Sequence, residues 1–202
     1  ACALGTRFNG QHVGHFGFAG VFSFHPRKSI TCGDGGVIVT NSDEAAARLR
    51  ALRNHGLEAY GGVNAGFSEI GLNFRLTEVQ AVLLNAQMDF VDEFINKKIS
   101  NVKAYDENLN NEFQKPDVNH QGHSWQSYHV VCKSQHQRDY QVSMLSKYGV
   151  YVSIGAQCIP AEPFYLNKYN LKLENYQHAM KANTTGFVLP IHENLDATDI
   201  AY

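Results

Sequence analysis

The chain has 202 residues, of which 44% are hydrophobic and 18% are charged, and its formal net charge is -2 at pH 7. This composition is typical of a globular protein with a packed core and excludes a disordered chain. The sequence shows no basic stripe, which argues against a nucleic-acid partner, and no apolar run reaches the roughly 20 residues that span a membrane.

The four cysteines are far apart in the sequence, at positions Cys2, Cys32, Cys132 and Cys158. A disulfide framework or a zinc site normally shows closer spacing, so we expect reduced thiols in a cytoplasmic protein. His120 and His123 lack a third ligand with suitable spacing, so the sequence predicts no metal site.

The first 40 residues have the pattern of short strands with tight turns. Asn9-Gly10 is a strong hairpin signal. Further on, the apolar runs Gly20–Phe22 and Val37–Val39 flank a glycine-rich connection. This pattern predicts two strands joined by a tight turn, in which glycine allows positive φ and close backbone approach.

Lys28 lies in that connection, five residues after Ser23. An amine near buried strand ends loses solvation, which favours the neutral form that attacks a carbonyl carbon and forms a Schiff base. Most lysines are solvated surface charges, so the type of residue alone does not identify a nucleophile. His25, three residues earlier, is close enough in sequence to tune this amine, but the preferred expectation is a structural hydrogen bond.

Residues 23–36 read Ser-Phe-His-Pro-Arg-Lys-Ser-Ile-Thr-Cys-Gly-Asp-Gly-Gly. This segment resembles the active-site segment of the DegT/DnrJ-type sugar-nucleotide aminotransferases, a family that uses pyridoxal 5'-phosphate (PLP). The resemblance implies that Lys28 is the catalytic residue and holds the cofactor as a Schiff base, and that Ser23 binds the cofactor phosphate. Asp34 stands where the family usually has glutamate, so the charge is kept on a shorter side chain.

Two helices are expected in the middle of the chain. Ser42, followed by two acids, predicts a helix that ends near Gly56. Thr77 and Gln80 form a capping-box pattern that begins a long helix, and the drift of its apolar stripe predicts a bend near Phe90.

Residues 71–81, Gly-Leu-Asn-Phe-Arg-Leu-Thr-Glu-Val-Gln-Ala, resemble a second motif of the same family. The resemblance implies that Asn73 reaches the cofactor phosphate of a partner subunit, and therefore a homodimer with shared active sites. From the residues alone, Asn73 and Arg75 are also consistent with a turn at the start of a helix that is held by local hydrogen bonds.

Pro116 and the turn-rich residues after it predict a domain boundary. We expect an α/β protein of PLP fold type I, with residues 1–115 as part of the PLP-binding large domain and residues 116–202 as a small C-terminal α/β domain. The expected elements of the second part are strands at 126–132, 150–154 and 189–192, helices at 138–148 and 175–183, and a loop at 159–165.

The resemblance implies a PLP-dependent aminotransferase that moves an amino group, from glutamate, to a keto sugar of a nucleotide-linked sugar in amino-sugar biosynthesis. The alternative is a non-catalytic fragment or a regulatory relative with the same fold. The family's aspartate that pairs with the pyridine nitrogen would fall just before Ala1, and a helix stops at Tyr202 soon after its start. We therefore expect the C-terminal portion of a longer protein.

Overall fold

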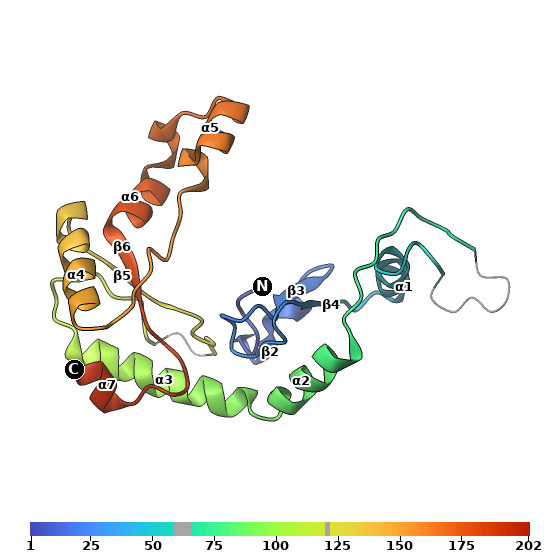
Figure 1. Ribbon diagram of the computed structural model, residues 1–202, viewed down its shortest axis with the longest axis horizontal. Helices are drawn as coiled ribbons and strands as arrows, with labels where there is room; N and C mark the ends of the chain where they lie inside the picture. Colours follow the sequence, from blue (N-terminus) through green and yellow to red (C-terminus); the bar gives the residue numbers. More distant parts are fainter. Residues whose placement is uncertain (59–65, 120–121) are drawn as a thin grey trace. The chain divides into compact units, whose positions relative to one another are not determined.

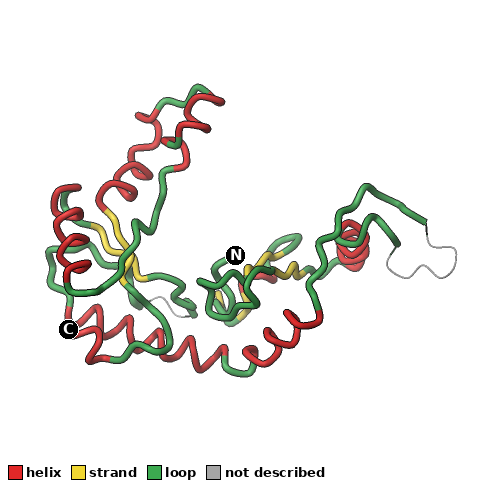
Figure 2. Tube along the Cα trace, viewed as in Figure 1, coloured by secondary structure: helices red, strands yellow, loops and turns green. Residues whose placement is uncertain are grey.

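The computed structural model describes residues 1–58, 66–119 and 122–202 (Figure 1). The chain divides into two compact units, Ala1–Ile95 with Gln121–Ser124 (unit 1) and Asn96–His120 with Trp125–Tyr202 (unit 2). Both units combine helices and strands (Figure 2), as expected for an α/β protein. The predicted division into residues 1–115 and 116–202 concerns the domains of a longer protein and remains a prediction.

Unit 1 begins with two pairs of antiparallel strands. The first pair is β1 (Arg7–Phe8) with β2 (Gln11–His12), and the second is β3 (Gly20–Ser23) with β4 (Gly36–Val39). A short 3-10 helix, η1 (Val13–His15), lies between the pairs. The turn at Asn9-Gly10 has positive φ at both residues, which confirms the predicted hairpin.

The helices of unit 1 begin where the capping residues predict. α1 (Asp43–Leu52) starts after Ser42, whose Oγ accepts a hydrogen bond from Ala45 N at 3.1 Å. α2 (Glu78–Met88) starts at the complete Thr77/Gln80 capping box. α3 (Val91–Asn108), which starts in unit 1 and continues in unit 2 from Asn96, follows after two residues, and this confirms the predicted interruption near Phe90. The core of this unit consists of Phe24, Ile30, Cys32, Leu84 and Val91.

Unit 2 is built around a third pair of antiparallel strands. β5 (Tyr128–Val131) pairs with β6 (Gly186–Leu189), with Tyr128 opposite Leu189. The other elements are α4 (Gln135–Lys147), η2 (Ile159–Ala161), α5 (Pro163–Tyr169), η3 (Leu173–Tyr176), α6 (Gln177–Thr185) and α7 (Ala197–Ala201). None of the helices in the described parts of the chain is both long and apolar enough to cross a membrane.

The core of unit 2 is aromatic. The Tyr105 and Tyr128 rings stack with centroids 5.0 Å apart, and Trp125 lies against Tyr128 at 6.3 Å. Burial raises the pKa of the Tyr128 hydroxyl to about 12, because the phenolate loses its hydration. The cluster of buried side chains consists of Val102, Tyr105, Trp125, Tyr128, Val130, Cys132, Phe187 and Leu189.

Three expectations for unit 2 are wrong. Residues 150–154 form no strand, and only Ser153 pairs with Val188 in an isolated bridge. The strand expected at 189–192 ends at Leu189, since Pro190 has no N–H to continue a ladder. The loop expected at 159–165 contains η2 and the start of α5, where Pro163 occupies the first helical turn.

Candidate active site

Lys28 lies in the connection between β3 and β4, in a turn that is closed by the backbone. Its N–H donates to the carbonyl oxygen of His25 at 2.9 Å. The Nδ1 of the same His25 accepts from Arg27 N at 3.2 Å, so the imidazole closes the turn, and the expected structural role of His25 is confirmed. The Lys28 side chain is half-buried.

Ser23 is the last residue of β3 and lies directly before this turn. Successive side chains of a strand point to opposite faces, so Phe22 and Phe24 share one face and Ser23 occupies the other. The Ser23 Oγ accepts from His25 N at 3.3 Å, and its N–H donates to Ala1 O at 3.2 Å. The structure therefore places the hydroxyl and the amine of the two predicted residues in one short segment.

Two glycines shape the return of the chain to β4. Gly33 has φ of 86°, in the left-handed region that other residues rarely adopt. Gly35 packs so closely that a Cβ there would lie 2.6 Å from Cys32 Sγ. A side chain at Gly35 would displace the buried Cys32, which explains this glycine without any ligand.

Two glutamines of α2 fix the lysine segment. The sequence indicated Gln80 only as a capping residue and did not indicate Gln87. Gln87 Oε1 accepts from Thr31 N at 3.0 Å, and Gln87 Nε2 donates to Thr31 O at 2.8 Å. Gln80 Nε2 donates to the Asp34 carbonyl oxygen at 2.8 Å. The two glutamines are seven residues apart and so share one face of α2, which is the signal that the sequence offered.

Cys2 is a further residue whose contact with the lysine segment the sequence did not indicate. Lys28 Nζ donates a hydrogen bond to Cys2 Sγ across 2.7 Å. The residues are 26 positions apart, and no local pattern brings them together. The thiol therefore lies beside the one atom that the proposed chemistry of Lys28 requires.

Asn73 lies in an extended segment that runs beside the end of α1. It pairs with Asn54 in an isolated bridge, and Phe74 N donates to Arg53 O at 2.9 Å. Arg75 Nε donates to Asn73 Oδ1 at 2.8 Å, which is the local hydrogen bond of the alternative interpretation. That bond leaves the donor end of the Asn73 amide available, while a role toward a partner subunit remains a prediction.

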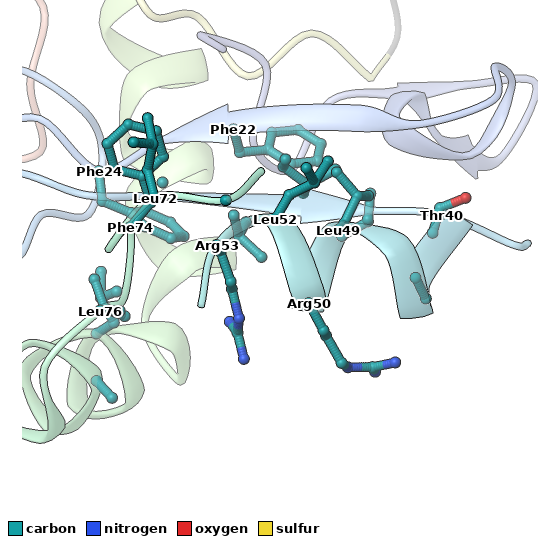
Figure 3. Close-up of a pocket in the computed structure, with 18 of the residues that line it drawn as sticks. Phe22, Phe24, Thr40, Leu49, Arg50, Leu52, Arg53, Leu72, Phe74 and Leu76 are labelled. Carbon is teal, nitrogen blue, oxygen red and sulfur yellow. The ribbon is translucent and has the colours of Figure 1, made fainter. Parts of the chain in front are cut away.

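An apolar cavity of about 990 Å³ lies in unit 1 (Figure 3). Figure 3 shows Leu49 and Leu52 turned toward Phe22, whereas Arg50 and Arg53 extend away from it. The alternation of extended chain explains its lining: Leu72, Phe74 and Leu76 border the cavity, and the residues between them do not. Its lining omits Ser23, Lys28 and Asn73, so the cavity is separate from the predicted site residues.

The described residues include no group of three histidine, cysteine or acidic side chains that could hold a metal ion. His120 lies outside the described residues. All four cysteines are free thiols, as the sequence predicts.

The donor set of the lysine segment fits a ligand that carries both an aldehyde and a phosphate group. Lys28 supplies an amine for a carbonyl carbon, and Ser23 supplies a hydroxyl for a phosphate oxygen. The turn at His25 and the amide of Gln87 hold the backbone between and after them. Such a pre-formed segment reduces the entropy that binding would otherwise cost.

Comparison with known proteins supports the family resemblance of the segments around Lys28 and Asn73. The model of the DegT/DnrJ/EryC1/StrS aminotransferase family matches residues 1–202. GDP-perosamine synthase of Caulobacter vibrioides is 36% identical over 119 residues, which are 57% of this chain and 32% of that protein.

Solved structures share the fold. The Helicobacter pylori aminotransferase PseC, involved in the biosynthesis of pseudoaminic acid, has a TM-score of 0.89 and 26% identity over 98% of this chain and 54% of that one. The PLP form of Spr1654 from Streptococcus pneumoniae has a TM-score of 0.88 at 21% identity, over 99% of this chain and 53% of that one. The chain thus spans about half the length of these two structures. Its match to GDP-perosamine synthase covers a smaller share, 32%, of that protein.

Proposed function

The chain belongs to the DegT/DnrJ/EryC1/StrS aminotransferase family, and from that premise we propose that the full-length protein transfers an amino group to a keto sugar carried by a nucleotide. PLP is the cofactor of this family, and when bound it supplies the electron sink of the reaction. GDP-perosamine synthase and PseC support a role in amino-sugar biosynthesis. We propose glutamate as the amino donor.

Lys28 carries the proposal. The Lys28 residue is half-buried and lies in a turn closed by His25, and this fixed backbone supports a role for Nζ in capturing a cofactor carbonyl. When Lys28 Nζ is not bound to the cofactor, it is free to act as a general acid and base. It would then move a proton between the substrate carbon and the cofactor carbon. Ser23 Oγ donates to the cofactor phosphate from the adjoining strand end.

Asn73 completes the proposed phosphate site from a second subunit. Its Oδ1 is occupied by Arg75, so Nδ2 remains as the donor for a phosphate oxygen. This assignment requires a homodimer with shared active sites, which we propose together with a cytoplasmic location. The free thiols support a reducing compartment.

Reductive trapping tests the role of Lys28. The full-length protein is mixed with PLP, its absorbance is recorded, and borohydride is added before peptide mass mapping. We expect the cofactor mass on Lys28, and loss of both the absorbance band and the mass in Lys28→Ala. Lys147→Ala, on the exposed end of α4, is the matched control and should trap as the parent does.

The same preparation separates the enzyme from a non-catalytic relative. An enzyme consumes the absorbance band when glutamate is added, because the amino group is transferred to the cofactor. Trapping on Lys28 without any response to a panel of amino donors would instead indicate a relative that keeps the site but not the turnover. Trapping at other lysines only would refute the assignment of Lys28.

A further inference from the structure

We propose that Cys2 is a positioning residue for Lys28: its thiol holds the amine in the cofactor-free protein and releases it when a carbonyl compound is captured. This inference rests on the proposed role of Lys28. It assigns a function to a side chain that neither the family motifs nor the spacing of the cysteines indicates.

The position of Cys2 is fixed by the backbone on both sides. Ala1 O accepts from Ser23 N at 3.2 Å, and Thr6 N donates to Ala3 O at 3.0 Å. The first bond holds Ala1 against the end of β3, where the Lys28 turn begins, and the second closes a local turn just after Cys2. The contact of 2.7 Å between Lys28 Nζ and Cys2 Sγ therefore joins two anchored segments.

Cys2 differs from the other cysteines in its surroundings. Cys32, Cys132 and Cys158 are 7%, 2% and 1% exposed and belong to the packed interior. Cys2 is exposed and has the Lys28 amine as its partner. A buried thiol packs as a small apolar side chain. An exposed thiol beside an amine can instead accept a hydrogen bond from that amine.

The direction of the effect follows from linkage. Lys28 Nζ donates to Cys2 Sγ in the free protein, and a nitrogen that bonds to a carbonyl carbon gives up hydrogen atoms and changes its position. A bond present only in the free state opposes capture by its own free energy. A single hydrogen bond of this kind corresponds to a change of about threefold to tenfold in a dissociation constant.

The test compares Cys2→Ala with Cys2→Ser in the full-length protein. PLP and pyridoxal, which lacks the phosphate, are titrated separately and followed by absorbance. We expect Cys2→Ala to bind both compounds about threefold to tenfold more tightly than the parent, because the competing hydrogen bond is gone. Cys2→Ser keeps a hydrogen-bond acceptor and should remain close to the parent.

Several outcomes would overturn the proposal. Equal or weaker binding by Cys2→Ala shows that the thiol does not restrain the amine. A change for PLP but not for pyridoxal shows that the effect arises at the phosphate, through Ser23, and a serine variant that matches alanine excludes the acceptor role. If the parent itself captures neither compound, the proposed role of Lys28 fails, which is a separate and recognisable result.

Discussion

The two four-residue strand pairs of this chain are alike in size and opposite in burial. β3 pairs with β4, and β5 pairs with β6, each through four antiparallel residue pairs. In the second pair, Val130 and Phe187 are 0% and 2% exposed, whereas Val21 and Ile38 of the first are 57% and 47% exposed. Within the 202 residues of this chain, equal ladders of hydrogen bonds thus occur with buried and with exposed apolar side chains.

The difference shows what holds each pair in place. An isolated pair of strands is marginally stable in water, so each needs support from elsewhere in its unit. β5 and β6 obtain it from the aromatic core of unit 2. The segment between β3 and β4, which carries Lys28, is held in two ways. Its residues Phe24, Ile30 and Cys32 are buried in the core of unit 1, and the side-chain amides of Gln80 and Gln87 bind its backbone.

We expect the largest difference in stability when one side chain of each strand pair is replaced by alanine. Phe187→Ala removes a buried ring from β6 and should lower the free energy of unfolding by about 3–5 kcal/mol. Ile38→Ala on β4 should cost about 1 kcal/mol or less, since much of this side chain remains in water. Urea unfolding of the two variants measures both changes, and equal losses would contradict the difference in cover.

Gln87→Ala tests how much the side-chain hydrogen bonds of α2 contribute to holding the lysine segment in unit 1. It removes two hydrogen bonds to Thr31, so we expect a loss of about 1–3 kcal/mol and faster hydrogen exchange at the Thr31 amide. Gln137→Ala is the matched control, because Gln137 makes a similar bond to Lys133 N at 2.9 Å in unit 2. If both variants leave exchange at Thr31 unchanged, α2 does not hold the lysine segment.

The smallest effect concerns the capping boxes, one in each unit. Backbone hydrogen bonds from Asp199 and Thr198 lower the pKa of the Asp196 carboxylate at the start of α7. A lowered pKa means that the cap contributes fully above the ordinary value of 3.8 and is lost as the pH falls through the folded value. The Thr77 cap of α2 has a hydroxyl and no such dependence.

Amide chemical shifts across an acid titration test this contrast. The amides of Thr198 and Asp199, which donate to Asp196 at 2.8 and 3.0 Å, should move together below the ordinary pKa. The Gln80 amide, which donates to Thr77, should not follow them. Parallel movement of all three amides would indicate general unfolding in acid instead of loss of one cap.

Local chemistry in the sequence was enough to predict much of the chain. The Asn9-Gly10 hairpin and the capping box at Thr77 depend on residues within a few positions of one another. Their dihedral preferences and short hydrogen bonds act before any tertiary contact forms. The proximity of Ser23 to Lys28 is of the same kind.

The tertiary structure decided the contacts between distant residues. Cys2 meets Lys28 across 26 positions and Gln87 meets Thr31 across 56, and neither pair has a local pattern. The segment at 150–154 has the composition of a strand and forms none, because a strand requires a partner edge and only Ser153 finds one. The sequence by itself therefore determined which residues could carry the chemistry, and packing determined which side chains stand beside them.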